Sequence, residues 1–133
     1  MPTYEWAVLR VVPRVERGEC VNVGVVVYCR ALDYLRAGLA ADLSRAQALD
    51  PELDVDAVRS QLESVAAVCR GDAAAGDSGR RAAGDRFRWL VAPRSTVVQP
   101  SPVHTGITDD PARELADLMA RMVSTPPRDT HGQ

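Results

Sequence analysis

Apolar residues gather in two long runs at the start of the chain. Residues 3–12 and 21–30 are rich in valine, and the eight residues between them, 13–20, carry alternating charges. β-Branched residues favour the pleated surface of a sheet, so the pattern predicts two neighbouring strands joined by a charged loop. Pro13 ends the first strand because it lacks the backbone N–H that a ladder needs. A third strand is predicted within residues 31–40.

The middle of the chain has the spacing of an amphipathic helix. Apolar residues recur every three or four positions over residues 55–69, and Gly71 is expected to end this helix. The sequence Asp-Pro-Glu at 50–52 predicts its start, since Asp caps helices and Pro fits their first position. Asp54 is a second candidate cap, and residues 41–49 are expected to form a short helix leading in.

The last third of the chain repeats these signals. Residues 80–91 predict a short helix. Residues 95–99 predict a strand, broken by Pro100 and Pro102, which favours a position at a sheet edge. Asp110 followed by proline predicts the start of a final helix.

Strands followed by helices in this order predict an α+β fold. We expect a small, mainly antiparallel sheet covered on one face by two or three helices, the longest near 54–70 and 110–123. Residues 1–124 are expected to form a single domain with a mobile loop at about 71–79, because neither half has enough apolar residues to fold alone. The Pro-rich segment 125–133 is expected to be a disordered tail.

Composition and charge narrow the class of protein. With 46% hydrophobic and 26% charged residues the chain can bury a sizeable core, and its net charge of −2 gives no general attraction to nucleic acid or anionic membranes. The longest apolar run, residues 21–29, is too short to cross a bilayer, and the N-terminus lacks the pattern of a signal peptide. We therefore expect a cytoplasmic protein that does not bind membranes, and we rank nucleic-acid binding below other functions.

The three cysteines, Cys20, Cys29 and Cys69, have neither metal-binding nor disulfide spacing. We expect them to be small hydrophobic side chains in a reducing cytosol, and we expect no metal and no cofactor. All 16 basic residues are arginine. A GC-rich coding bias, typical of a bacterium, explains this composition; the alternative is that the guanidinium groups bind anions through paired hydrogen bonds.

The first candidate binding residues lie in the N-terminal hairpin. In its loop, Arg14, Arg17 and Glu19 form either a solvated surface or a recognition surface for a protein or an anion. Arg10 lies within an apolar strand, so its side chain either faces solvent or pairs with a buried carboxylate.

Two further candidates lie in the second predicted strand. Asn22 and Gly24 are two apart, so they are expected to share one face of that strand. In one interpretation the Asn satisfies loop amides while the Gly leaves room for a packed helix. In the other, both residues form the floor of a binding site, where Gly allows close approach and the amide both donates and accepts.

The remaining candidates are basic or imidazole groups. Residues 80–94 carry five arginines against one aspartate, which gives a local charge of +4. This segment is either a solvated helix face or an anion site built from Arg88, Arg94 and Ser95. His104 is either structural or a general base oriented by Asp109. No serine in a nucleophile elbow and no second histidine at metal-binding spacing accompanies it.

Four stretches of the chain point to a family. They are YxWAVLRxVP at residues 4–13, RGExVNVGV at 17–25, FRWLVAPRS at 87–95 and PVHxGxxxDP at 102–111. Together they resemble an uncharacterised bacterial family, domain of unknown function 3037 (DUF3037). The resemblance implies no established activity. Members of that family are often encoded beside serine/threonine kinases of the HipA-like persistence-toxin class, which implies a small regulatory or accessory protein.

Two functions therefore compete. The first is a non-enzymatic cytosolic accessory protein that binds a protein partner, a HipA-like kinase by the resemblance, through the charged segments 14–19 and 80–95. The alternative is an enzyme that binds a small molecule, such as an anionic compound or a nucleotide, in one pocket. In that pocket arginine would hold the anion and histidine would move a proton, and the converging residues would be Arg10, Asn22, Arg88, Arg94 and His104.

Overall fold

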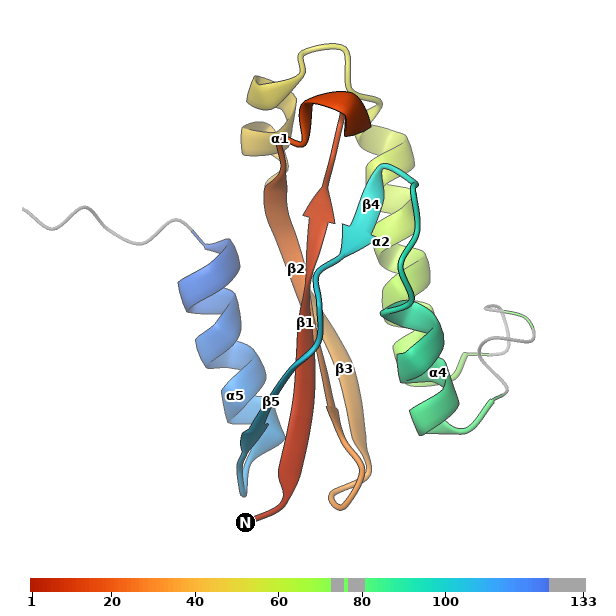
Figure 1. Ribbon diagram of the computed structural model, residues 1–133, viewed down its shortest axis with the longest axis vertical. Coiled ribbons are helices and arrows are strands. Elements are labelled where there is room, and N and C mark those ends of the chain that lie inside the picture. The colour runs from red at the N-terminus through yellow and green to blue at the C-terminus, as the bar shows by residue number, and fades with distance from the viewer. Residues whose placement is uncertain (73–75, 77–80, 125–133) are drawn as a thin grey trace, which may run out of the picture.

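The computed structural model describes residues 1–72, 76 and 81–124 (Figure 1). Its centre is an antiparallel sheet with the strand order β3-β2-β1-β4, and β5 also pairs with β1. The predicted α+β class with a mainly antiparallel sheet is confirmed. The strands are β1 (Thr3–Val11), β2 (Val21–Cys29), β3 (Tyr34–Leu39), β4 (Val98–Pro100) and β5 (His104–Ile107).

Helices lie on both faces of this sheet, which corrects the expected cover on one face. In Figure 1, α2 and α4 lie on one side of the strands and α5 on the other. The cause is visible in β2, where every residue from Val23 to Cys29 is buried, so that apolar side chains point to both faces. The helices are α1 (Ser44–Leu49), α2 (Val55–Arg70), α4 (Ala83–Leu90) and α5 (Pro111–Leu118), with the 3-10 turn η1 (Val15–Arg17) and the π-helical turn η3 (Met119–Val123).

The ends of α2 follow ordinary capping chemistry. The carboxylate of Asp54 accepts the backbone N–H of Ala57 at 3.0 Å, and Gly71 ends the helix with a left-handed φ of 74°. Asp50 instead follows the end of α1 and accepts the N–H of Glu52 at 3.0 Å. The predicted helix start at residues 50–52 is therefore a turn, and the second candidate cap is the one that is used.

A polar cluster fixes the start of α5. As predicted, the carboxylate of Asp110 caps the helix, accepting the N–H of Arg113 at 3.2 Å. Buried Thr108 accepts the N–H of Asp110 at 3.0 Å and donates its hydroxyl to Glu114 at 2.8 Å. The hydroxyl of Tyr4 donates to the other oxygen of Glu114 at 3.4 Å, which ties α5 to the beginning of β1.

The sheet edge formed by β4 and β5 is irregular, as its prolines predicted. The strand expected at residues 95–99 occupies Val98–Pro100, and β5 was not predicted. Between the two, Ser101 replaces the missing ladder bonds. Its N–H donates to the carbonyl of Val8 at 2.7 Å, and its hydroxyl accepts the N–H of Val8 at 2.8 Å. The backbone of β1 thus stays satisfied where its neighbour changes strand.

The predicted helix near residues 80–91 is present as α4, and it buries Phe87 and Leu90. Most of the predicted loop at 71–79 and the predicted tail at 125–133 lie outside the described residues. Within the described part of the chain, no helix combines the length and the apolar character that a bilayer crossing needs.

Candidate functional site

Three polar side chains lie in a row across three neighbouring strands. Arg10 of β1 is paired with Asn22 of β2 on one side and with Gln99 of β4 on the other. Residues directly opposite one another in antiparallel strands point to the same face of the sheet. The row therefore presents a guanidinium group between two side-chain amides on the face that α5 partly covers.

Arg10 is the charged group of this row. Its side chain is half-buried, yet it makes no hydrogen bond or ion pair with any residue that the structure describes. Of the two alternatives for an arginine in an apolar strand, the structure thus favours the solvent-facing one, because no buried carboxylate is supplied. A guanidinium group in this state keeps its donors available for an anion.

Asn22 has a structural bond of its own. Its side-chain amide donates to the carbonyl of Met122, at 3.0 Å, in the last turn of η3. The pairing of β1 and β2 shifts at this point, because Leu9 faces Gly24 while Arg10 faces Asn22, which leaves one extra residue on β2. This bulge turns Asn22 and Gly24 to opposite faces and corrects the expectation that they share one.

The missing side chain of Gly24 makes room for backbone. A Cβ at this position would lie 2.8 Å from the carbonyl oxygen of Gly38 and 3.1 Å from a methyl carbon of Leu9. Gly24 therefore permits the close approach of β3, and the atoms around it belong to strands rather than to a packed helix. The predicted binding role of Gly24 has no support in this contact.

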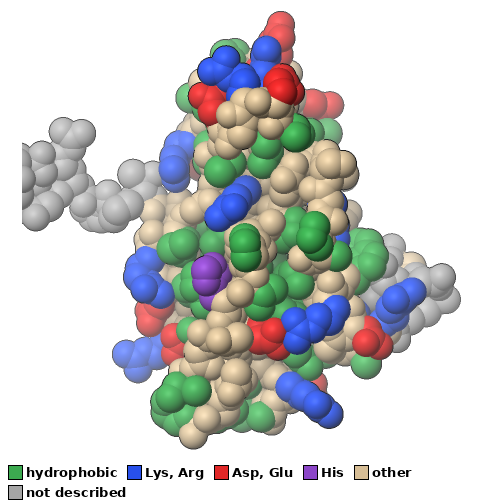
Figure 2. Space-filling view, viewed as in Figure 1, with side chains coloured by type: hydrophobic (Ala, Val, Ile, Leu, Met, Phe, Trp, Pro, Cys, Tyr) green, Lys and Arg blue, Asp and Glu red, His purple; other side chains and the backbone are tan. Residues whose placement is uncertain are grey.

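Two aromatic rings extend the row along β1. Trp6 is paired with His104 of β5, and their rings stack with centroids 4.4 Å apart at an interplanar angle of 25°. Trp6 and Arg10 are four residues apart in one strand, so they point to the same face. Figure 2 shows the histidine on the molecular surface, bordered by hydrophobic side chains. We call the set Trp6, Arg10, Asn22, Gln99 and His104 the β1 platform.

The platform is accessible at its two ends. α5 packs on β2 and β3, and η3 packs on β2, and Val8, which lies between Trp6 and Arg10 on the same face of β1, is buried. His104 is exposed, and Trp6, Arg10 and Gln99 are half-buried. Sequence reasoning found Arg10, Asn22 and His104 but missed Trp6 and Gln99. The alternation along β1 could have added Trp6, whereas Gln99 needed the pairing of β4.

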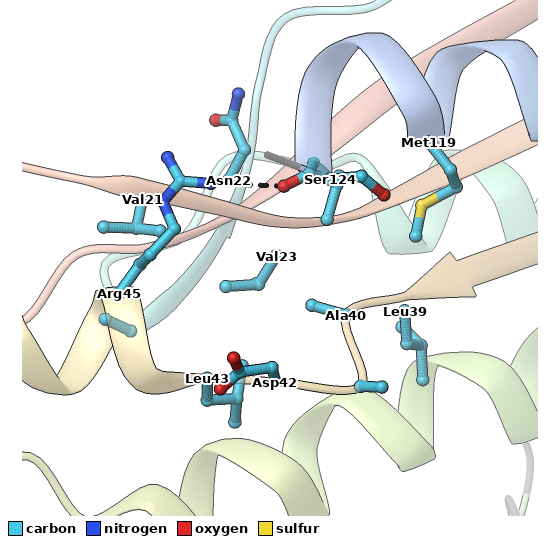
Figure 3. Close-up of a pocket in the computed structure, with 13 residues that line it drawn as sticks. Val21, Asn22, Val23, Leu39, Ala40, Asp42, Leu43, Arg45, Met119 and Ser124 are labelled. Atoms are coloured by element: carbon cyan, nitrogen blue, oxygen red, sulfur yellow. Dashed lines mark hydrogen bonds between the residues drawn. The ribbon is translucent and has the colours of Figure 1, made fainter. Parts of the chain in front are cut away.

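A hollow of 490 Å³ lies beside Asn22, between β2, the end of β3, α1 and η3 (Figure 3). Its lining is mostly apolar, with Val23, Leu39 and Met119 among the side chains. At one side Arg45 donates to the carbonyl of Val123 at 3.1 Å. Arg45 and Asn22 thus hold two successive carbonyls at the end of η3, so the polar groups of this hollow anchor a helix end.

The charged loop forms a separate feature. Arg17 and Glu19 make an ion pair of 2.6 Å, and both are well exposed. The hydrogen bond from Arg17 lowers the pKa of the Glu19 carboxyl below its ordinary value. Together with Arg14 these residues border a 350 Å³ hollow against the end of α1. In Figure 1 this loop lies at the top of the molecule and α4 lies well below it, but the chain after α4 returns toward the loop, where the N–H of Val12 donates to the carbonyl of Val97 at 2.7 Å.

The basic segment faces the other side of the sheet. Both outer nitrogens of Arg88 donate to the carboxylate of Glu5 at 2.8 Å, and this pair raises the pKa of Arg88. Glu5 points away from the platform because it alternates with Trp6 along β1. Arg94 lies over the ring of Trp89, with its guanidinium carbon 5.0 Å from the ring centroid, and donates to the carbonyl of Trp89.

These positions separate the residues of the enzyme alternative. Arg10, Asn22 and His104 share the platform face, whereas Arg88 is bound to Glu5 and Arg94 to Trp89. Ser95, next to Arg94, is exposed and makes no side-chain hydrogen bond with a described residue. No hydrogen bond joins His104 to exposed Asp109. Over residues 1–72, 76 and 81–124, no group of three acidic, histidine or cysteine side chains could hold a metal ion.

The platform contains a matched pair for testing what Asn22 does. We expect Asn22→Ala to lower the free energy of unfolding by about 1.5 kcal/mol, because the part-buried carbonyl of Met122 loses its donor. Gln99→Ala removes an amide from the same row, but this amide makes no hydrogen bond with a described residue, so its change should stay within about 0.5 kcal/mol. Urea unfolding followed by circular dichroism measures both. Equal losses would contradict the structural role of Asn22.

Comparisons with known proteins give one match. The model of a family described as "Protein of unknown function (DUF3037)" matches residues 6–123. The match includes every residue of the β1 platform. No curated protein and no solved structure matches the chain.

Proposed function

Since this chain belongs to the DUF3037 family, a family of unknown function, we propose from the geometry of the site that it is a non-enzymatic accessory protein that binds a protein partner. The observation that carries this proposal is the β1 platform, where a stacked Trp6–His104 pair and an Arg10 without a partner among the described residues lie partly exposed on one sheet face. Tryptophan and arginine are the residue types that dominate the binding energy of protein interfaces.

The state of His104 supports binding over turnover. A general base needs a second group that orients its imidazole and a substrate within hydrogen-bond reach. In the described part of the chain the ring of His104 stacks on Trp6 and donates no hydrogen bond to a carboxylate. An imidazole held in this way offers a flat surface for packing.

We propose a HipA-like kinase as the partner and the bacterial cytosol as the compartment. This choice comes from the tendency of such kinases to be encoded beside members of the family. The contact would be centred on the platform, because the arginines of the other two segments already have partners within the chain: Arg88 binds Glu5, Arg94 lies over Trp89, and Arg17 pairs with Glu19.

A charge-reversal variant tests the proposal. Arg10→Glu should weaken binding to a HipA-like kinase by about tenfold or more, because it replaces a positive charge on the platform with a negative one that would repel carboxylates on the partner. Arg113→Glu is the matched control, since Arg113 is an exposed residue on α5 whose side chain makes no hydrogen bond with a described residue. Isothermal titration calorimetry with the purified kinase measures both affinities. No complex with the unaltered protein at micromolar concentration would contradict the proposal.

A further inference from the structure

We propose that the β1 platform binds an extended acidic segment of the partner, with an aromatic side chain over Trp6 and His104 and an Asp or Glu over Arg10, four residues away. This inference rests on the proposed function and specifies the chemistry that the partner must offer.

The charge of the segment follows from Arg10. Its guanidinium group is half-buried and unpaired among the described residues, and its neighbours across the strands are uncharged amides. The carboxylate of Glu114 lies at the other end of β1, where the hydroxyl groups of Thr108 and Tyr4 engage it. A carboxylate from a partner would therefore meet a positive charge that no described residue neutralises. Asn22 and Gln99 would flank it with further polar groups.

The spacing of the platform selects a peptide over a mononucleotide. Trp6 and Arg10 are four residues apart, which is about 13 Å along a strand. In a mononucleotide only one ribose separates the base from the phosphate, so the molecule is shorter than this span along the strand. An extended peptide covers the distance in four residues and points alternate side chains to the same side.

The aromatic end has one free face. Trp6 and His104 stack on each other, and the exposed fraction of the pair belongs mainly to His104. Aromatic side chains pack well on such a surface in offset or edge-on geometry. The expected segment thus carries Trp, Tyr or Phe, three intervening residues and then Asp or Glu, or the same two groups in the opposite order.

The test uses three synthetic peptides with blocked termini, so that the aspartate is their only charge. The first, GSWTSTDGS, has the expected spacing of four. The second, GSWTSTNGS, replaces the aspartate with asparagine, and the third, GSWTDTSGS, has the same composition as the first with a spacing of two. Titration into the isotopically labelled protein, followed by two-dimensional NMR, gives both the affinity and the location of each peptide.

We expect the first peptide to shift the amide signals of Trp6, Arg10 and His104 and to bind about fivefold more tightly than either control peptide. Arg10→Gln should remove this preference, whereas Arg113→Gln should retain it. Equal affinity of all three peptides, shifts confined to another surface, or an unchanged preference in Arg10→Gln would each overturn the inference. If the kinase binds through the platform and the peptides fail, the partner-binding function stands and only its acidic chemistry is rejected. If neither binds, both are rejected.

Discussion

Raising the pH from about 8 to about 11 is expected to lower the free energy of unfolding by about 2.5 kcal/mol through Cys69 alone. Burial raises the pKa of this thiol to about 12, from an ordinary value of 9.0, and outweighs the nearby guanidinium groups of Arg86, Arg36 and Arg70, which act in the opposite direction. Above pH 9 the unfolded chain loses the thiol proton while the folded chain keeps it. The contribution of the Cys69 thiol to the free energy of unfolding is therefore fully present below pH 9 and is lost as the pH rises toward 12.

The composition of the chain makes this alkaline loss easy to assign. The chain has no lysine, so between these pH values only cysteine, tyrosine and the N-terminal amine titrate. Burial also raises the pKa of Tyr4 and of Tyr34, and Glu114 adds to the effect on Tyr4. Both tyrosines therefore add to the loss in the same direction, at higher pH than an ordinary thiol.

Urea unfolding at both pH values, with a reducing agent present, measures this prediction. Cys69→Ala should be less stable than the parent protein at pH 8 because it leaves a small cavity, but its stability should depend less on pH. Cys20→Ala is the matched control, since Cys20 is exposed and its removal should leave the alkaline loss intact. A Cys69→Ala variant that loses as much stability as the parent protein would exclude the thiol as the cause.

Gly24→Ala is expected to lower the free energy of unfolding by about 3 kcal/mol. The new methyl group would lie 2.8 Å from the carbonyl oxygen of Gly38, which belongs to the backbone of β3 and is held by the ladder with β2. Leu9 and Leu39 close the remaining space, with methyl carbons at 3.1 and 3.3 Å. Because the nearest atom is backbone, the clash can be relieved only by moving a strand.

Gly38→Ala provides the comparison for this prediction. Its methyl group would lie 2.7 Å from Cγ and 2.8 Å from Sδ of Met119, which are atoms of a flexible side chain. We expect a loss of about 1 kcal/mol here, although the contact distances are nearly the same. Thermal unfolding of the two variants measures the difference. If Gly38→Ala is the more damaging change, the backbone contact of β3 is not the reason for Gly24.

Local sequence patterns predicted most of the secondary-structure elements. The valine-rich runs predicted β1 and β2, the three-to-four spacing predicted α2, and Asp110 followed by proline predicted the start of α5. These signals work because propensity, capping and periodicity act over a few neighbouring residues. The same logic failed at residues 50–52, where two candidate caps compete and the turn after α1 takes the first of them.

The apolar pattern of β2 indicates that helices cover both faces of the sheet, not one face as the element order suggested. A strand that faces solvent on one side alternates apolar and polar residues, whereas residues 23–29 of β2 are apolar almost without interruption. This continuity indicates burial on both faces. The sequence thus contains the information that both faces are buried, but it does not specify which helix lies on which face.

The amino-acid sequence alone was sufficient for the types of element, most of their caps and the presence of an arginine and an asparagine in unusual strand positions. The sequence did not reveal which residues lie beside the strand residues of the platform, because these neighbours come from segments about ninety or a hundred positions away. Met122 receives the Asn22 amide, Gln99 stands beside Arg10, and His104 stacks on Trp6. A single extra residue in β2 then turned Asn22 and Gly24 apart. Strand register depends on the packing of the whole sheet, and a shift of one position moves a side chain to the opposite face.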